Sequence, residues 1–433
     1  MADYKKRIVD AILADKLSYM GAVWVRGPKW CGKTTTCEQQ AKSMLYLADP
    51  QTREINLLLA NTAINRLLEG ATPRLLDEWQ DIPQLWDAVR FAVDHRDGPG
   101  QFMFTGSAVP PDADVNSPED VRKVYHTGTG RIARINMRPM SLWESGESSG
   151  EVSLEALFNG ENVVGARPLL TQLEDIAFVI CRGGWPSAVD LKGARAVALA
   201  KDYVDSVVES DISRVDATVR NPERARRLLH SLARLQGTQA SAPAIVADMK
   251  GHEPMSFSEN TVYSYLSALG RIFVTDDMKA WCPNLRCKVP ARTTDTRYFV
   301  DPSIAAAALR IGPGELMNDI TALGLIFETM AARDLRVYAA ALGGEVRHYL
   351  DKSGLECDAV ICLENGDYGL VEIKVGGEKL TEKGASSLNR LANKIDAAST
   401  KPPKFKMVLT AVGDIAYCRS DGVLVCPISA LRP

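Results

Sequence analysis

Short apolar runs alternate with amphipathic stretches over the first third of the chain. Strand-like runs lie at residues 21–25, 74–76 and 101–104, and the stretches among them carry helical patterns. Strands that alternate with helices are typical of an α/β domain built on a parallel sheet. We therefore predict a parallel-sheet domain over residues 1–145.

The hydrophobic pattern changes beyond residue 145. A stretch rich in Ser, Gly and Glu at 144–151 indicates a linker or an exposed loop. Apolar residues then recur at helical spacing in 173–180 and 197–208. This periodicity predicts a helical region over residues 146–213.

The middle segment, residues 214–305, has the pattern of three helices followed by two strands. The helices are predicted at 222–236, 244–249 and 258–270, and the strands at 272–274 and 298–300. This order resembles a winged helix, a fold that reads DNA through a helix in the groove. The residues that it would turn toward DNA are Ser258, Asn260, Thr261 and Ser264. A helical protein-interaction module is the alternative interpretation.

The charge distribution directs attention to the same segment. The net charge of −3 argues against a uniformly basic nucleic-acid binder. Residues 214–297, however, hold thirteen Lys/Arg and eight Asp/Glu, so a local excess of +5 leaves −8 for the remainder. We therefore expect phosphate contacts here, with DNA as the partner.

Length and cysteine usage bound the class of protein. The 433 residues exceed what one hydrophobic core usually organises. No apolar run approaches the roughly 18 residues of a membrane helix, and no signal-peptide core follows the first residues. The nine cysteines are scattered singly, which favours reduced thiols. These features predict a cytoplasmic protein that does not bind membranes.

A glycine-rich loop follows the first strand-like run. It matches the pattern G-x-x-x-x-G-K-[ST]. The loop comprises Gly27, Pro28, Lys29, Trp30, Cys31, Gly32, Lys33 and Thr34, with Thr35 next to it. In such a loop the backbone N–H groups surround the β-phosphate, Lys33 reaches the β- and γ-phosphates, and Thr34 holds Mg²⁺. The loop therefore predicts ATP and Mg²⁺ as ligands.

Two acidic residues follow the second strand-like run. Asp77 would hold Mg²⁺ through water, and Glu78 would polarise the attacking water. After the next strand, Ser107 would sense the γ-phosphate, with an ordinary strand-end turn as the alternative. ATP hydrolysis is thus the predicted reaction, with Lys33 and Glu78 as catalytic residues.

Further motifs make the nucleotide-binding pattern more specific. They are Phe-Thr-Gly-Ser at 104–107, Gly-Arg-Ile at 130–132, Met-Ser-Leu-Trp-Glu at 140–144 and Arg-Gly-Gly-Trp-Pro at 182–186. Together with the loop and the Leu-Leu-Asp-Glu run, they resemble the prokaryotic AAA+ ATPases that carry a C-terminal domain of unknown function. The resemblance covers nearly the whole chain. It implies an ATPase core, a helical lid and a C-terminal domain like the PD-(D/E)xK nucleases. It also implies Arg131 as an arginine finger or sensor and Arg182 as a lid sensor, and it leaves homo-oligomer formation open.

The last region carries a second set of charged residues. A helix is predicted around Glu328, and strands are predicted at 345–350, 355–363 and 370–374. Asp358, thirteen residues and then Glu372-x-Lys374 is the spacing of a PD-(D/E)xK site across a β-hairpin. Asp358, Glu372 and Glu328 would hold Mg²⁺ or Mn²⁺, and Lys374 would position or deprotonate water. A solvated strand face is the alternative.

The sequence thus predicts a multidomain α/β protein. The predicted domains are a P-loop AAA+ core with a parallel sheet (1–145), a helical lid (146–213), a winged-helix-like domain (214–305) and a restriction-endonuclease-like domain (306–433). The predicted function is that of a Mg²⁺-dependent AAA+ ATPase acting on or near DNA. Two alternatives stay open. One is an ATP-controlled regulatory or scaffold protein whose nuclease-like domain is not catalytic, and the other is a transcriptional regulator.

Overall fold

The computed structural model describes residues 4–109, 129–216, 218–252, 258–283, 294–395 and 401–433. They form two compact units. The first unit comprises Met1–Pro139, Glu209–Arg220 and Ser267–Val274, and the second comprises Met140–Val208, Asn221–Leu266 and Thr275–Pro433. The four domain boundaries derived from the sequence stay predictions.

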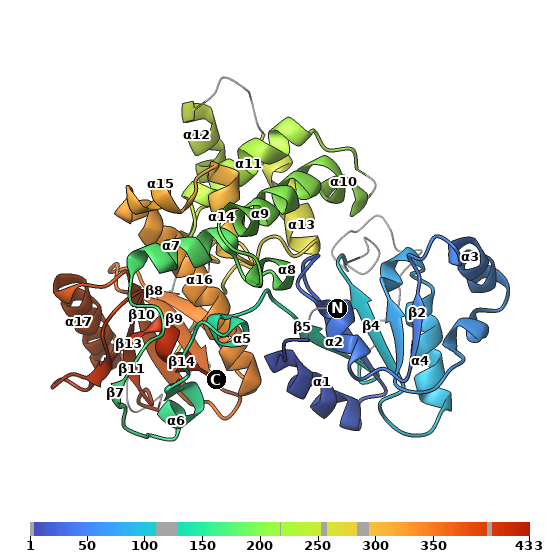
Figure 1. Ribbon diagram of the computed structural model, residues 1–433, viewed down its shortest axis with the longest axis horizontal. Helices are drawn as coiled ribbons and strands as arrows, with labels where there is room; N and C mark the ends of the chain where they lie inside the picture. Colours follow the sequence, from blue (N-terminus) through green and yellow to red (C-terminus); the bar gives the residue numbers. More distant parts are fainter. Residues whose placement is uncertain (1–3, 110–128, 217, 253–257, 284–293, 396–400) are drawn as a thin grey trace. The chain divides into compact units, whose positions relative to one another are not determined.

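A five-stranded parallel sheet organises the first unit (Figure 1). Its strands are β1 (Ala22–Arg26), β2 (Ser43–Tyr46), β3 (Arg74–Asp77), β4 (Phe102–Gly106) and β5 (Ile132–Asn136). They lie in the order β2-β3-β4-β1-β5. The predicted parallel sheet is confirmed, and its two edge strands are the ones that the apolar pattern missed.

Helices cover both faces of this sheet. They are α1 (Ile8–Tyr19), α2 (Lys33–Glu38), α3 (Arg53–Thr62) and α4 (Leu85–His95), with α10 (Ile212–Arg214) and short 3₁₀ turns at Ile64–Leu68 and Trp79–Asp81. Side chains alternate along β1, so Trp24 packs in a core with Val89 of α4, whereas Val23 packs in another with Leu13 of α1.

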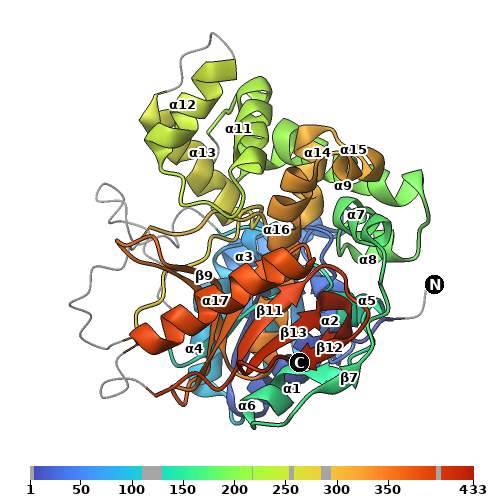
Figure 2. The same ribbon diagram turned by 90° about the vertical axis from the view of Figure 1, so that its left-hand side faces the viewer.

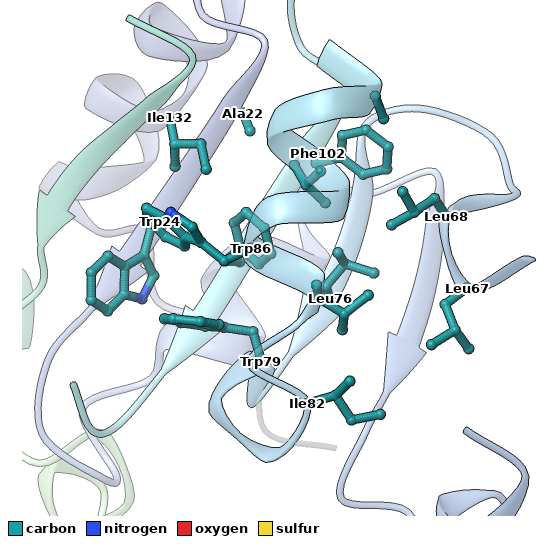
Figure 3. Packing of buried hydrophobic residues seen from close by; sticks show 14 of the residues in the cluster. Ala22, Trp24, Leu67, Leu68, Leu76, Trp79, Ile82, Trp86, Phe102 and Ile132 are labelled. Carbon is teal, nitrogen blue, oxygen red and sulfur yellow. The ribbon is translucent and has the colours of Figure 1, made fainter. Parts of the chain in front are cut away.

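An aromatic cluster fixes the segment that follows β3 (Figure 3). The Trp79 ring centroid lies 5.0 Å from that of Trp86 and 5.5 Å from that of Trp24. Trp79 is 2% exposed. Because Trp79 directly follows Glu78, this packing holds the backbone of both predicted acidic residues in place.

Helices make up the first part of the second unit. They are α5 (Leu142–Ser145), α6 (Leu154–Phe158), α7 (Leu173–Arg182), α8 (Pro186–Val189), α9 (Ala194–Ser206), α11 (Pro222–Arg234), α12 (Ala242–His252), α13 (Glu259–Arg271, which ends in the first unit), α14 (Pro302–Leu309), α15 (Pro313–Met317) and α16 (Ile320–Ala341). A π-helical turn, Val207–Asp211, follows α9. The helices predicted for the lid and for the middle segment are confirmed.

The wing predicted after α13 differs in its first strand. Antiparallel pairing joins Thr275 to Phe299 and Met278 to Thr296. Residues 272–274 form a turn instead of the predicted strand, because Phe273 adopts a left-handed backbone with φ of 59°. The second predicted strand, 298–300, does contain the Phe299 pairing.

A seven-stranded mixed sheet forms the rest of the second unit. Its strands, in the order β7-β12-β13-β11-β10-β9-β8, are β7 (Val164–Ala166), β12 (Ala416–Cys418), β13 (Val423–Pro427), β11 (Lys406–Thr410), β10 (Tyr368–Lys374), β9 (Glu356–Cys362) and β8 (Glu345–Leu350). Helix α17 (Glu378–Lys394) lies across this sheet (Figure 2). A small parallel pair joins β6 (Val152–Ser153) to β14 (Leu431–Arg432). The three strands predicted at 345–374 are confirmed.

The structure also bears on the expectations about membrane helices and cysteines. None of the described helices is both long and apolar enough to cross a membrane. Cys282 is disulfide-bonded, so the prediction of reduced thiols is wrong at that position.

Candidate functional site

The predicted phosphate-binding loop joins the carboxyl end of β1 to the first turn of α2. Gly32 caps α2 in a left-handed conformation with φ of 98°, which glycine adopts without steric cost. A Cβ added at Gly27 would lie 2.0 Å from the Met137 carbonyl oxygen. Glycine is therefore required at both ends of the loop for the backbone to follow this path.

Lys33 is buried beside the loop. Its side chain is 5% exposed, and Nζ donates to the Pro28 carbonyl oxygen at 2.8 Å. Among the residues that the structure describes, Lys33 forms no ion pair. A buried ammonium group is costly unless an anion compensates its charge. The site is therefore suited to an anionic ligand such as a phosphate.

Asp77 connects the loop to the neighbouring strands. Its Oδ1 accepts hydrogen bonds from Thr34 Oγ1 at 2.7 Å and from Thr105 Oγ1 at 2.6 Å. Burial raises the pKa of Asp77, although both hydrogen bonds act in the opposite direction. The structure thus brings together Thr34 and Asp77, the two predicted Mg²⁺ ligands. Thr105 belongs to the Phe-Thr-Gly-Ser motif recognised in the sequence, but its contact with Asp77 was not predicted.

Glu78 is oriented by two polar side chains. Its Oε2 accepts from Ser107 Oγ at 3.1 Å and from Gln80 Nε2. The backbone at Glu78 is left-handed, with φ of 54°, which is uncommon for a residue with a side chain. The structure thus brings together Glu78 and Ser107, the predicted water-polarising residue and the predicted γ-phosphate sensor. Gln80 was missed, since nothing but its spacing of two residues from Glu78 signals the contact.

Other residues of the loop are engaged in the first unit. Lys29 Nζ lies 2.6 Å from Asp211 Oδ1, in the π-helical turn that packs with this unit. Cys31 is buried, and its thiol donates to the Met137 carbonyl oxygen. Trp30, in contrast, is 44% exposed. An ion pair thus joins Lys29 to the π-helical turn at Val207–Asp211. Sequence spacing does not reveal this contact.

Arg131 lies away from the loop within its own sheet. It directly precedes β5, whose first residue pairs with the first residue of β1, whereas the loop follows the last residue of β1. Its Nε lies 2.8 Å from Asp94 Oδ1, and the side chain is 47% exposed. The expected sensor role is therefore wrong for the nucleotide of the same chain. Because the strands are parallel, Arg131 lies at their amino ends, whereas the loop lies at their carboxyl ends.

Arg182 belongs to the second unit and is buried there. Its Nη1 and Nη2 donate to the two carboxylate oxygens of Glu147 at 2.5 and 2.7 Å, and it is 3% exposed. The N–H of Gly184 donates to Asp301 Oδ2 at 3.0 Å. This geometry favours a structural role for the Arg-Gly-Gly-Trp-Pro motif, because a sensor role would require the Glu147 pair to break.

In the second unit, the predicted nuclease residues converge on one lysine. Lys374 Nζ lies 3.0 Å from Asp358 Oδ2 and 2.6 Å from Glu372 Oε2. The antiparallel pairing of β9 with β10 produces this arrangement, since Glu372 and Asp358 directly follow and precede the paired residues Val371 and Ala359. Asp358 also accepts from the Ile373 N–H at 2.7 Å. The two carboxylates therefore lie on the same face of the sheet.

Burial dominates the electrostatics of this cluster. Glu372 is 3% exposed, and burial, followed by the charge of Asp358, raises its pKa to about 8. Glu372 Oε1 is buried and has no hydrogen-bond partner among the residues that the structure describes. Although burial lowers the pKa of Lys374, the charges of Asp358 and Glu372 raise it above its ordinary value. The cluster therefore holds one buried carboxylate oxygen that no hydrogen-bond donor reaches in the described part of the chain.

Glu328 does not complete a three-carboxylate metal site. Its Oε1 accepts from the Tyr298 hydroxyl at 2.5 Å, and burial, followed by the charge of Asp358, raises its pKa to about 8. Within the described residues, no three His, Cys, Asp or Glu side chains gather closely enough to hold a metal ion. In the described residues Glu328, Asp358 and Glu372 thus form no preformed three-carboxylate site, since Tyr298 and Lys374 contact them, and their role as metal ligands stays a prediction.

The raised pKa of Glu372 predicts a pH effect on stability. A carboxyl whose pKa rises from 4.5 to about 8 on folding stabilises the protein below pH 4.5, and this contribution is lost as the pH rises through 8. Relative to wild type, Glu372→Gln should therefore gain about 1 to 3 kcal/mol in unfolding free energy between pH 5 and pH 8.5. Urea unfolding at several pH values measures this.

The control for that experiment is Glu364→Gln, which changes an exposed glutamate in the turn between β9 and β10. Its stability should follow the wild-type pH profile. A Glu372→Gln profile parallel to wild type would contradict the proposed burial of this carboxyl.

Three segments of the chain match known family models. Residues 20–145 match an AAA domain, residues 173–315 a domain of unknown function (DUF8612), and residues 323–431 a domain of unknown function (DUF4143). The resemblance to AAA-type ATPases with a C-terminal domain of unknown function is thereby supported. The nuclease-like character of that C-terminal domain is not part of these matches.

Relatives and solved structures are distant. The uncharacterized proteins Mb2031c of Mycobacterium bovis and Rv2008c of Mycobacterium tuberculosis are each 22% identical over 378 residues, which is 86% of this chain and 74% of the relative. The Walker-type ATPase PABY2304 of Pyrococcus abyssi is 14% identical, with a TM-score of 0.42 over 71% of this chain and 97% of its own. The ORC1 protein of Aeropyrum pernix, solved in complex with DNA, is 13% identical, with a TM-score of 0.22 over 72% and 94%. TM-scores this low do not establish a shared fold.

The loop geometry and the family match agree on the first unit. The loop, the buried Lys33 and the Thr34–Asp77 contact all lie within residues 20–145. Residues 20–145 are therefore similar to AAA-type ATPase domains, and their loop has the geometry of a phosphate-binding site.

Proposed function

We propose that this chain hydrolyses ATP with Mg²⁺ at the carboxyl edge of the first-unit sheet. The observation that carries the proposal is the hydrogen bond from Thr34 to Asp77 beside the buried ammonium group of Lys33. Lys33 and the loop N–H groups would hold the phosphates, and Thr34 and Asp77 would hold Mg²⁺. Bound Mg²⁺ would supply positive charge to the phosphoryl oxygens.

Glu78 is the proposed group that acts on water. Ser107 and Gln80 fix its carboxylate, so that it can orient a water molecule and accept its proton. Asp77 must be ionised to hold a cation, and its raised pKa makes this dependent on pH. ATP turnover should therefore decline in acid.

The test is ATP turnover with Mg²⁺, with excess EDTA and with added DNA. Turnover that requires Mg²⁺ supports the proposal, and stimulation by DNA would favour action on or near DNA. Absence of turnover despite tight ATP binding would favour the alternative, a nucleotide-controlled regulatory or scaffold protein.

Metal-dependent phosphodiester cleavage is a second candidate function, located in the second unit. The convergence of Asp358 and Glu372 on Lys374 favours it, together with the buried Glu372 Oε1 that lacks a partner. These carboxylates fit a divalent cation by their chemistry, and Lys374 would orient water beside it. The ion pairs of Lys374 equally suit a non-catalytic domain, so a nuclease assay with Mg²⁺ or Mn²⁺ decides between the two.

DNA contact by α11 to α13 completes the proposal. Ser258, Asn260 and Ser264 are exposed, and Tyr263 beside them is 54% exposed. The arginines of α11 are less available than the sequence suggests, because Arg226 pairs with Asp205 and Arg227 with Glu223. Exposure of the polar face of α13 supports a groove-binding role, and a protein partner for the same face is the alternative.

Replacing Arg224, Arg226 and Arg227 by Gln should weaken DNA binding for all sequences. The salt dependence should flatten by about one unit of log–log slope for each lost phosphate contact. Fluorescence anisotropy at several salt concentrations measures both effects. Arg195→Gln, an exposed arginine at the start of α9, is the control. Unchanged binding in the triple variant would indicate a protein-docking role.

A further inference from the structure

A cavity of about 320 Å³ lies among α9, α11 and α14 in the second unit. Figure 1 shows these helices together, and α14 contacts both of the others. The charged side chains that line the cavity are Lys201, Asp205, Arg226 and Arg310. All of its lining residues fall inside the segment that matches a domain of unknown function. The cavity belongs to a different unit from the phosphate-binding loop.

The charges around the cavity are unbalanced. Arg226 pairs with Asp205, and these two charges cancel on one wall. Lys201 and Arg310 form no ion pair among the residues that the structure describes. Glu315 interacts with the Lys201 charge only at longer range. The lining therefore carries a net formal charge of +2 in the absence of a ligand.

The backbone at Arg310 gives an independent indication. Arg310 caps α14 in a left-handed conformation, with φ of 58° and ψ of 34°. Helices usually place Gly or Asn at such a position, since other side chains raise its free energy. The N–H of Arg310 caps the carbonyl groups of Ala306 and Ala307, but a glycine would make the same contacts without the strain of the left-handed backbone. A ligand contact of its guanidinium group would account for it.

We propose that this cavity binds a phosphate monoester. A monoester carries close to two negative charges at neutral pH and so matches the net charge of +2, whereas a carboxylate or a phosphodiester would leave one cation uncompensated. The Arg310 fork suits bidentate contact with phosphate oxygens, and Lys201 adds a second positive charge. Val204, Leu229 and the two alanines at 307 and 308 form an apolar wall for the organic part of the ligand.

Two sources carry this chemistry, a free nucleotide and the 5′-phosphorylated end of a nucleic acid strand. The test uses full-length Lys33→Ala protein, so that the phosphate-binding loop of the first unit does not take up the probes. Isothermal titration calorimetry compares thymidine 5′-monophosphate with thymidine, and 5′-phosphorylated with unphosphorylated tetrathymidylate. In at least one pair, the phosphorylated probe should bind about tenfold more tightly or better. The pair that shows this identifies the source.

The variants are chosen to keep the fold intact. Arg310→Gly removes the guanidinium group and relieves the left-handed strain, so lost binding cannot reflect a weakened helix end. Lys201→Ala removes the second charge. Each should weaken binding of the phosphorylated probe by about tenfold, whereas Arg195→Ala on the same helix α9 should not. Equal binding of phosphorylated and unphosphorylated probes, or binding that survives both variants, would overturn the proposal.

Discussion

Glu78→Gln protein is expected to bind ATP as wild type does and to hydrolyse it at least about a hundredfold more slowly. Glutamine keeps the shape of the side chain and its contacts with Ser107 and Gln80, but it cannot accept a proton from water. The loss should therefore appear in kcat, while the dissociation constant of ATP stays the same. Steady-state turnover and equilibrium binding of a fluorescent ATP analogue measure the two quantities.

Lys33→Ala should give the complementary result, a loss of ATP binding itself. Lys33 is 5% exposed, and its ammonium group donates to the Pro28 carbonyl oxygen, so its charge is available to ground-state phosphates. Glu69→Gln, an exposed glutamate of the first unit, is the control and should match wild type in both assays. Full turnover in Glu78→Gln would show that another group activates water.

The nucleotide site was predictable because its pieces are local in sequence. The phosphate-binding loop is recognised by glycines at fixed positions between a strand and a helix. Asp77 and Glu78 are recognised as an acidic pair that directly follows a strand. The contacts of Lys29 with Asp211 and of Asp77 with Thr105 join residues far apart in the chain. No spacing rule connects such pairs, so their detection depended on the fold.

Arg131 and the first wing strand show where sequence reasoning failed. A Gly-Arg pair before an apolar run marks a strand start, but only the strand order shows that this start lies opposite the loop. At 272–274 the apolar pattern is consistent with a strand, yet Phe273 turns the chain. Local pattern does not report the sign of φ at a residue other than glycine.

The C-terminal cluster was predicted in part for the same reason. A tight hairpin brings Asp358 and Glu372 together through local register, and two-residue spacing places Lys374 on the same face. The position of Glu328 depends on how α16 packs, and its contact with Tyr298 lies thirty residues away in sequence. The sequence could supply the residue types, but not the contacts that Tyr298 and Lys374 make with these carboxylates.

Glu372→Ala and Lys374→Ala are each expected to abolish Mg²⁺- or Mn²⁺-dependent DNA cleavage while ATP hydrolysis remains at the wild-type rate. Glu372 supplies a buried oxygen atom, without a partner in the described residues, to which a cation would bind. Its removal leaves Asp358 alone as a ligand. Lys374 is the only cation that the structure places between both carboxylates in the described part of the chain. Gel analysis of supercoiled plasmid, run beside ATP turnover on the same preparations, measures both activities.

The expected loss is at least about a hundredfold for either variant, because each removes charge at the reacting phosphate. Lys374→Arg is the informative companion, since it keeps the positive charge but cannot give up a proton at neutral pH. If Lys374 only positions water by its charge, this variant retains partial cleavage; if it transfers a proton, cleavage is lost.

Glu345→Gln, an exposed change on β8, should leave cleavage intact. Cleavage that persists in both alanine variants would assign it to another site or to a contaminant. Absence of cleavage in wild type, with ATP turnover retained, would instead identify the C-terminal domain as a non-catalytic module attached to an ATPase.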